Sequence, residues 1–258
     1  MKQKIGSPVQ KDLLRFAQVF SQILHIGKDI EFVEIGEVLK TARYAIQQNV
    51  DTLDEGVEDR LVVEEELKEN MNTFLYLIVI FTKITKSNSS NERFEAMKTI
   101  YQVVRLNPRY RNGCTLLHLC VNSSTPVDTF HTSDIVRFPC ALAAKLLVEA
   151  GADVEAMDNE RNTPLHWIVT YKRVVHDFAS LHSIISLLIE SGAHVDVVNV
   201  DGNTPFDCAA TTVAQIILKT QQKMSLKCLA AQSVKKHRLT YQGHVPVQLE
   251  KFIELHGL

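Results

Sequence analysis

Apolar residues recur at intervals of three and four along the first part of the chain, which is the spacing of one face of an α-helix. An acidic stretch runs directly into a strongly apolar segment, and alternating strand patterns are nearly absent. Asn107 and Pro108 should end this region, because the residue before proline is pushed out of the helical conformation. The sequence therefore predicts paired helices over residues 1–106. They are expected at 10–26, 29–49, 57–69, 71–85 and about 93–105.

The second part of the chain contains an internal repeat. The stretches "NGCTLLHLC", "ERNTPLHWI" and "DGNTPFDCA" align on their threonines, and Gly-Ala pairs precede the second and third copies. A turn, a threonine, Pro-Leu-His, an apolar helix and then Gly-Ala-Asp form the ankyrin pattern. The sequence therefore predicts three ankyrin repeats over residues 109–220, the last one degenerate, in an all-α fold of the α-solenoid type.

Each repeated position has an expected structural role. Threonine can cap the first helix of a repeat, proline suits its first turn, and glycine can end the second helix in a left-handed conformation. The histidines are expected to hydrogen-bond the repeat turns and not to catalyse. The predicted structural positions are Thr115, His118, Gly151, Thr163, Pro164, His166, Gly192, Thr204 and Pro205.

The spacing between the aligned threonines exceeds the ~33 residues of an ordinary ankyrin repeat. The extra residues are expected at 122–139 and 171–182, between the paired helices of the first and second repeats. Insertions of this kind lie on one face of a repeat array and often bind a partner. Whether these two inserts contact a substrate, a second copy of the chain or nothing stays open.

Composition narrows the class of protein. A net charge of −2 gives no reason to expect nucleic acid or an anionic membrane as a partner. The five scattered cysteines indicate reduced thiols of a cytoplasmic or nuclear protein, and no signal peptide is recognisable at the start. The longest apolar run, 74–81, is too short to span a bilayer.

No cofactor, metal site or catalytic residue is expected. His118 and Cys120 are two positions apart on one helix, where side chains do not converge, and zinc-type pairs such as C-x-x-C are missing. A thiol enzyme would need a base beside its cysteine, which this spacing does not supply. The sequence therefore favours a non-catalytic protein.

An apolar stripe follows the predicted repeats. Leu226, Ala230 and Val234 share one face of a helix expected at 222–236, and Pro246 begins a further helix after a turn around Gly243. The stripe either packs inward and closes the repeat stack, or faces outward as an anchor for a partner. The lysines around it form a basic cluster, interpreted as a solvated flank in preference to a calmodulin-target or anionic-surface helix.

These two helical segments resemble the box at the end of Cullin-2 ubiquitin-ligase receptors. In such a box the first half has the pattern small-Leu-x-x-x-Cys-x-x-x-aliphatic and docks into Elongin C, while the second half selects Cullin-2. This chain has alanine where the pattern has cysteine, and Cys228, two residues earlier, should point elsewhere. The resemblance implies that Elongin C would contact Ser225, Leu226, Ala230 and Val234, and Cullin-2 would contact Val245, Pro246, Leu249, Phe252 and Ile253.

With "DLLRFAQVFSQ" near its start and the ankyrin repeats before the box, the chain resembles the FEM (feminisation) family, most of all its B-type branch. The resemblance implies a tetratricopeptide-like region at 1–106 and an Elongin C/Cullin-2 box at 221–258. It also implies that the family's N-terminal, degron-reading ankyrin array is missing from this sequence.

The function implied by the resemblance is a substrate-recognition subunit, or a fragment of one, of a ubiquitin ligase. Its partners would be Elongin B and Elongin C, Cullin-2 with its RING subunit, and protein substrates degraded through C-terminal degrons. The alternative is a plain ankyrin scaffold that binds another protein through its inserts and has no connection to a ligase.

Overall fold

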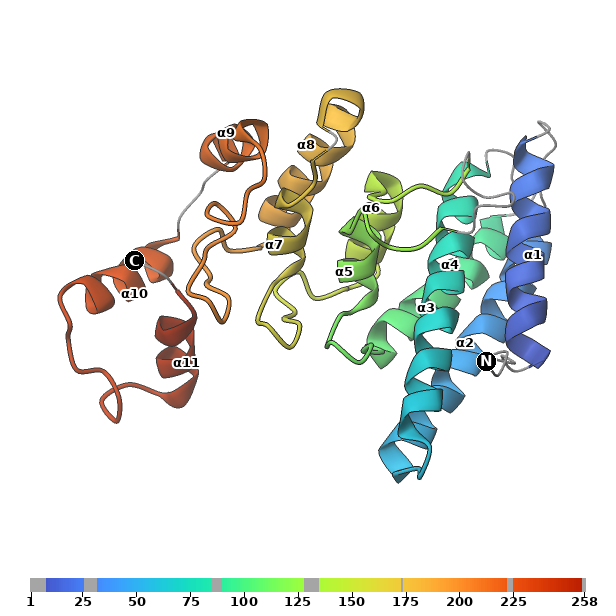
Figure 1. Ribbon diagram of the computed structural model, residues 1–258, viewed down its shortest axis with the longest axis horizontal. Helices are drawn as coiled ribbons and strands as arrows, with labels where there is room; N and C mark the ends of the chain where they lie inside the picture. The colour runs from blue at the N-terminus through green and yellow to red at the C-terminus, as the bar shows by residue number, and fades with distance from the viewer. Residues whose placement is uncertain are drawn as a thin grey trace, which may run out of the picture. The chain divides into compact units, whose positions relative to one another are not determined.

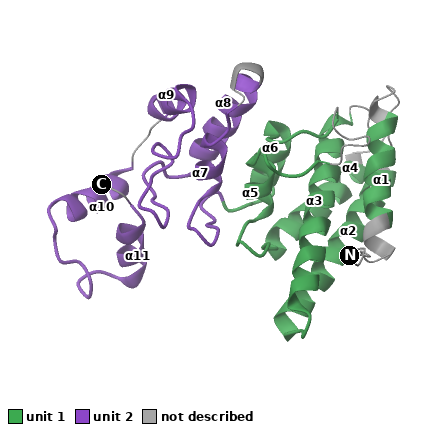
Figure 2. Cartoon of the chain, viewed as in Figure 1, with its two compact units in different colours: residues 1–153 green, residues 154–258 purple. Residues whose placement is uncertain are grey.

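The computed structural model describes residues 8–25, 32–84, 90–127, 135–172, 174–221 and 225–256. The chain divides into two compact units, residues 1–153 and 154–258 (Figure 2). Within the described ranges every regular element is a helix, and the strand-type pairing is a single bridge between Val197 and His256 (Figure 1). The prediction of an all-α fold is therefore confirmed.

The first unit is built from paired long helices followed by one short pair. Its core packing joins α2 to both α3 and α4, and α1 to α3. The expected acidic helix and the apolar segment after it form one continuous helix, α3, because nothing in the sequence between them breaks it. The helices are α1 (Pro8–His25), α2 (Phe32–Glu55), α3 (Arg60–Lys83), α4 (Ser90–Leu106), α5 (Leu116–Val121) and α6 (Ala141–Glu149).

The second half of α3 is the core of the first unit. Every residue from 70 to 81 is buried, so this helix is enclosed on all sides by its neighbours. The Nδ2 group of the buried Asn70 donates a 2.8 Å hydrogen bond to Oδ1 of Asn49 on α2, while its Oδ1 has no hydrogen-bond partner. Among the described residues no helix combines the length and the apolar character needed to cross a bilayer.

The end of α4 falls where the sequence predicted it. Asn107 adopts a positive φ of 49°, and its N–H donates a 3.0 Å hydrogen bond to the carbonyl of Val104. Asparagine tolerates the left-handed conformation better than most residues, which explains how the chain leaves the helix immediately before Pro108.

The ankyrin threonines and histidines make reciprocal caps. Thr115 accepts a hydrogen bond from the His118 N–H, and the Thr115 N–H donates to Nδ1 of His118 at 3.2 Å. Thr163 and His166 form the same pair at the start of α7, where the Thr163 N–H donates to Nδ1 at 3.1 Å. Two otherwise unpaired helix-end donors are satisfied in each case.

The two glycines close the second helices. Gly151 after α6 and Gly192 after α8 have φ values of 89° and 103°. In both places the following N–H reaches back five residues, from Ala152 to Leu147 and from Ala193 to Leu188, at 3.0 and 2.9 Å. This is the hydrogen-bond pattern of a Schellman motif, which requires a left-handed residue at this position.

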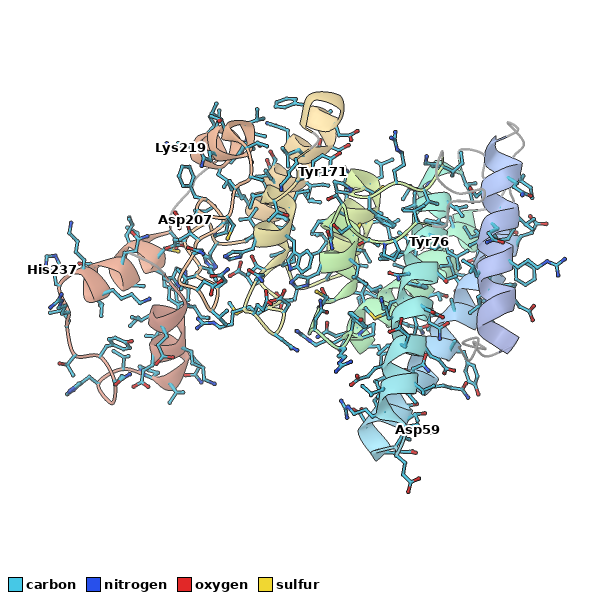
Figure 3. All side chains as sticks on the ribbon, in the orientation of Figure 1. Asp59, Tyr76, Tyr171, Asp207, Lys219 and His237 are labelled. Carbon is cyan, nitrogen blue, oxygen red and sulfur yellow. The ribbon has the colours of Figure 1, made fainter. Side chains whose placement is uncertain are left out.

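The second unit contains five helices in its described part: α7 (Pro164–Val169), α8 (Val174–Glu190), α9 (Thr212–Gln221), α10 (Leu226–Lys236) and α11 (Val247–Leu255). Helix α8 packs against both α7 and α9, and α10 packs against α11. The turn at Thr204 has the same reciprocal cap, with the exposed Asp207 in the place of histidine (Figure 3). The hydrogen bonds from Thr204 lower the pKa of the Asp207 carboxyl.

The insert expected at 171–182 is not a loop between the paired helices. Most of it is the first part of α8, with a kink where Asp177 leaves the helical conformation. The hydroxyl of Tyr171, which is labelled in Figure 3, donates to the Asp177 carboxylate at this kink. The insert adds to the helix because Leu181 continues its buried stripe toward Ile184 and Ile185.

The first insert does leave the helical pattern. Residues 122–127 and 135–139 form no helix, and the residues between them lie outside the described part of the chain. Thr125 donates through its hydroxyl to the Leu119 carbonyl at 2.5 Å, and the Tyr76 hydroxyl of α3 donates to the Pro126 carbonyl at 2.6 Å. Val136 is fully buried. The described ends of this insert are therefore fixed to the first unit.

The third repeat copy lacks its first helix. Residues 205–208 form only turns, although Pro205 is buried and the Cys208 N–H donates to the Thr204 carbonyl at 3.0 Å. The Ala210 N–H donates to the Val169 carbonyl of α7, which fastens this turn to the preceding repeat. The second helix of the copy is present as α9. The expected degeneracy of the last repeat therefore lies in its first helix.

Replacing His166 by alanine should destabilise the second unit by about 2 kcal/mol, because the buried Thr163 N–H and the Asn203 carbonyl lose their partners. Burial lowers the pKa of His166, so the neutral ring accepts through Nδ1 and donates through Nε2 near pH 7. Replacing the exposed Asp207, the equivalent cap in the third copy, should cost less than about 1 kcal/mol.

The measurement is urea unfolding followed by the fluorescence of Trp167, the single tryptophan of the chain. Its indole N–H donates a 2.9 Å hydrogen bond to Asp158 in the same repeat turn, so it reports on this unit. If the His166→Ala and Asp207→Ala variants lost the same free energy of unfolding, burial of the capping residue would not determine how much it contributes to stability.

Candidate functional site

The start of α10 is defined by the serine that opens the predicted Elongin motif. Ser225 is the N-cap, and its Oγ accepts a 3.1 Å hydrogen bond from the Cys228 N–H. A serine in this position satisfies one of the unpaired donors at a helix start, so helix begins at Leu226. The small residue at the head of the motif therefore has a local structural role in addition to the predicted one.

The apolar stripe of α10 faces outward. The Leu226 side chain is 85% exposed, and Leu229 and Ala230 are exposed on the same face of the helix, while Val234 is half-buried near its end. The inward-packing interpretation of the stripe therefore does not describe this structure. Leu229 was not among the predicted contact residues, although its position three after Leu226 would have indicated it.

The opposite face of α10 holds the helix in place. Cys228 and Ala231 are buried, and Gln232 donates through Nε2 to Oδ2 of Asp196 at 3.1 Å. Cys228 therefore points away from the exposed stripe, as the sequence analysis expected. Because these small buried residues bring α10 close to the rest of the unit, its larger apolar residues stay on the outside.

The predicted Cullin-2 residues separate into exposed and buried groups. Pro246 precedes α11 as its N-cap and is exposed together with Leu249, while Val245 is half-buried. Phe252 is half-buried and Ile253 is buried, so these two attach α11 to the second unit. Val247 and Leu239 are exposed apolar residues that the sequence analysis did not include. Val247 follows Pro246 directly, and only its exposure in the structure identifies it as a candidate contact residue.

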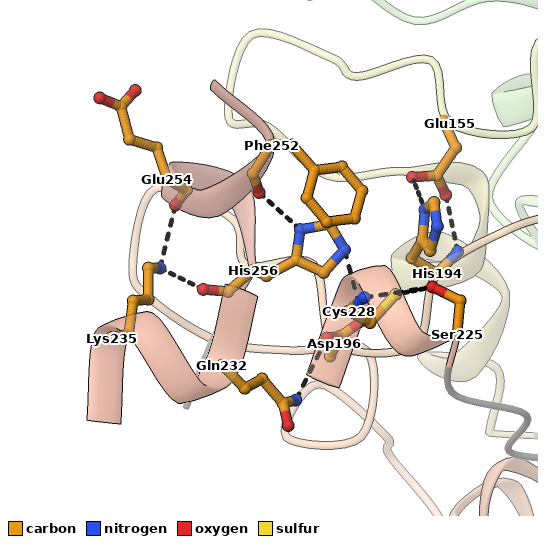
Figure 4. Close-up of polar contacts among 10 residues, drawn as sticks. All are labelled: Glu155, His194, Asp196, Ser225, Cys228, Gln232, Lys235, Phe252, Glu254 and His256. Atoms are coloured by element: carbon orange, nitrogen blue, oxygen red, sulfur yellow. Dashed lines mark hydrogen bonds and ion pairs between the residues drawn. The ribbon is translucent and has the colours of Figure 1, made fainter. Parts of the chain in front are cut away.

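Two lysines of the basic cluster connect α10 to α11. Lys235 donates through Nζ to the carbonyl of Glu254 at 3.1 Å and to the carbonyl of His256 (Figure 4). Its burial, with a contribution from Arg161, lowers the pKa of Lys235. Lys227 lies 3.8 Å from the centre of the Phe252 ring, in a cation–π contact. Part of the cluster therefore has a structural function within the second unit.

The fold and the repeat turns define an ankyrin-repeat protein of the interaction type. The ankyrin repeat family matches residues 160–200, which contain α7 and α8. The solved ankyrin repeat domain of Bcl-3 aligns with a TM-score of 0.31 and 12% identity, over 83% of this chain and 98% of that one. At this TM-score and identity, the match gives no information on the function of the present chain.

The chain is a homologue of the fem-1 proteins along nearly its whole length. It is 30% identical over 261 residues to the zebrafish (Danio rerio) "Protein fem-1 homolog A", a match that covers 94% of this chain and 38% of that protein. The human (Homo sapiens) "Protein fem-1 homolog C" is 30% identical over 250 residues, covering 95% and 38%. The resemblance to the FEM family is thus confirmed, while the assignment to the B-type branch stays a prediction. The chain spans about two fifths of the length of these relatives.

Proposed function

We propose that this chain is a non-catalytic substrate-recognition subunit, or part of one, of a Cullin-2–Elongin B/C ubiquitin ligase. Elongin C would bind the exposed face of α10, and Cullin-2 with its RING subunit would bind near the start of α11. Protein substrates carrying C-terminal degrons would be held for ubiquitination by the ligase, as the resemblance to the FEM family implies.

The observation that carries this proposal is the exposure of Leu226. A leucine exposed to this extent at the first turn of a well-capped helix contributes nothing to the core, whereas burial in a partner would remove its apolar surface from water. Leu229 and Ala230 extend the same face, so the helix offers a short row of apolar contacts. An amphipathic helix that lies in an apolar groove of its partner uses this arrangement.

The proposed role of this chain depends on where it binds its partners and not on a reaction that it catalyses itself. Transfer of ubiquitin would be carried out by the other subunits, while this chain would fix where a substrate lies. The exposed pair Pro246 and Leu249 supports a second contact on α11, beside but separate from the α10 face. Two adjoining faces would allow two partners to bind together.

The test is stepwise assembly with purified components. We expect the chain to bind Elongin B/C and the resulting complex to bind Cullin-2. A Leu249→Asp variant should retain Elongin B/C and bind Cullin-2 roughly tenfold or more weakly, since a charge in an apolar contact is costly. Gln248→Asp, at another exposed position on the same helix, adds the same charge and should behave as wild type.

Failure of the folded wild-type chain to bind Elongin B/C would overturn the proposal. That result would favour the plain ankyrin scaffold, with a partner bound elsewhere, for example at the half of the second insert that carries the exposed Phe178. Circular dichroism of each preparation establishes that the chain is folded before binding is measured.

A further inference from the structure

The Nε2 atom of His256, in the second unit, is a buried nitrogen without a hydrogen-bond partner. The His256 side chain is 1% exposed, and its Nε2 makes no hydrogen bond. Its Nδ1 lies 2.6 Å from the Phe252 carbonyl, to which it can only donate, so in the neutral ring Nε2 carries the lone pair. A buried acceptor without a partner loses about 1–3 kcal/mol of hydration, and it calls for an explanation.

The atom facing this nitrogen is also an acceptor. Oδ1 of the buried Asp196 lies 3.6 Å from His256 Nε2. A second proton on the ring would turn the contact into an ion pair, but it would place a charged imidazolium where the side chain is 1% exposed, and burying a charge is costly. Two acceptors that face each other in this way are satisfied by a cation between or beside them.

Two further ligand types converge on the same point. His194, Cys228 and His256 each offer one ligand atom, and these atoms all lie within 4.8 Å of one another (Figure 4). They come from three separate segments: the turn after α8, the buried face of α10 and the end of α11. A tetrahedral zinc ion would bring its nitrogen and sulfur ligands to about 3.3–3.8 Å from each other, so a contraction of roughly 1 Å would close the set.

The surrounding contacts are those that orient metal ligands. Nδ1 of His194 lies 2.8 Å from Oε2 of Glu155, and the His194 N–H donates to the other oxygen of the same carboxylate. Glu155 thus fixes the tautomer of His194 and leaves Nε2 for a ligand, the usual arrangement of a carboxylate behind a metal-bound histidine. Ser225 Oγ lies 3.0 Å from Sγ of Cys228, where its hydroxyl can donate to a thiolate.

We propose that His194, Cys228 and His256 bind one zinc-class transition-metal ion, with Asp196 or a water molecule as the fourth ligand. Imidazole and thiolate are the ligands that zinc prefers, and the thiol of Cys228 releases its proton to solvent when the metal binds. Cys228 and His256 are buried, which indicates a structural site and not a catalytic one.

The consequence of metal binding is a fixed C-terminal segment. The end of α11 already contacts the turn after α8, because the Val198 N–H donates to the Leu255 carbonyl at 2.8 Å. A metal ion would add α10 to this pair through Cys228 and tie three distant segments together. It would hold the buried face of α10 in place, and with it the direction of the exposed face. This inference stands on its own geometry, and its test does not need Elongin or Cullin-2.

The experiment is a titration of the reduced, chelator-treated chain with Co²⁺, followed by displacement with Zn²⁺. We expect one equivalent of Co²⁺ to produce a thiolate-to-cobalt charge-transfer band and the visible bands of a tetrahedral ion, both abolished by Zn²⁺. Cys228→Ala should lose the charge-transfer band. Cys208→Ala, which removes a half-buried cysteine of the same unit, should retain it.

A second readout uses the wild-type chain alone, so that it does not depend on how a variant folds. Zn²⁺ should raise the midpoint of thermal unfolding relative to the chelator-treated chain, and Mg²⁺ should not. The proposal is overturned if the reduced wild type gives no charge-transfer band, or if a folded Cys228→Ala variant gives the same band as wild type. It is equally overturned if Zn²⁺ leaves the unfolding midpoint unchanged.

Discussion

Replacing Leu226 by alanine should weaken the binding of Elongin B/C roughly ten- to a hundredfold while the chain stays folded. Burying a leucine side chain contributes about 1.5–3 kcal/mol, and most of this would be lost with the truncated side chain. The fold should hardly respond, since Leu226 makes little contact within the second unit and exposed substitutions usually change stability by less than about 0.5 kcal/mol.

The measurement is isothermal titration calorimetry with purified Elongin B/C, and urea unfolding of each variant establishes its stability. Ile216→Ala is the matched control, because Ile216 is an aliphatic residue of α9 with 56% of its surface exposed. It removes a comparable apolar group from another helix of the same unit and should bind as wild type. If Leu226→Ala destabilised the chain and Ile216→Ala did not, Leu226 would belong to the core, against the proposed anchor.

Replacing Phe74 by alanine should destabilise the first unit by about 3–5 kcal/mol, the range found for large aromatic truncations in protein cores. Phe74 is fully buried in the part of α3 that is enclosed on all sides. The cavity left behind would lie between packed long helices, whose movement toward one another is restricted. The loss should therefore fall in the upper part of the range.

Urea unfolding followed by circular dichroism measures this effect, with Phe94→Ala as the control. Phe94 is on α4 of the same unit and is 63% exposed, so the same substitution there should cost less than about 0.5 kcal/mol. If Phe74→Ala and Phe94→Ala lowered the free energy of unfolding by similar amounts, the assignment of α3 as the core of the first unit would be contradicted.

The sequence alone predicted the local structure of this chain well. The apolar spacing that places Ile35, Leu39 and Ile46 on one face of α2 follows from the period of the helix, and all of them are buried. The caps at Thr115 and Thr163 could be predicted for the same reason, because a helix end leaves donors that only a few residue types satisfy. Such features depend on residues within a few positions of each other.

The second insert could not be predicted in this way. Its sequence contains paired valines and an aspartate that are neutral or unfavourable within a helix, and the helix is kinked at Asp177. The segment is helical nevertheless, because Leu181 is buried together with the rest of the α8 stripe. Tertiary packing decided this element against a weak local preference.

The direction of a helix face and the meeting of distant side chains were decided only by the tertiary structure. Periodicity groups Leu226 with Ala230 but says nothing about which side of α10 meets the rest of the chain, and burial of Cys228 on the other side answers that question. The cluster of His194, Cys228 and His256 has no signature in the sequence, since its members are far apart along the chain. Local rules act over a turn of helix, whereas these contacts arise only when separate segments pack together.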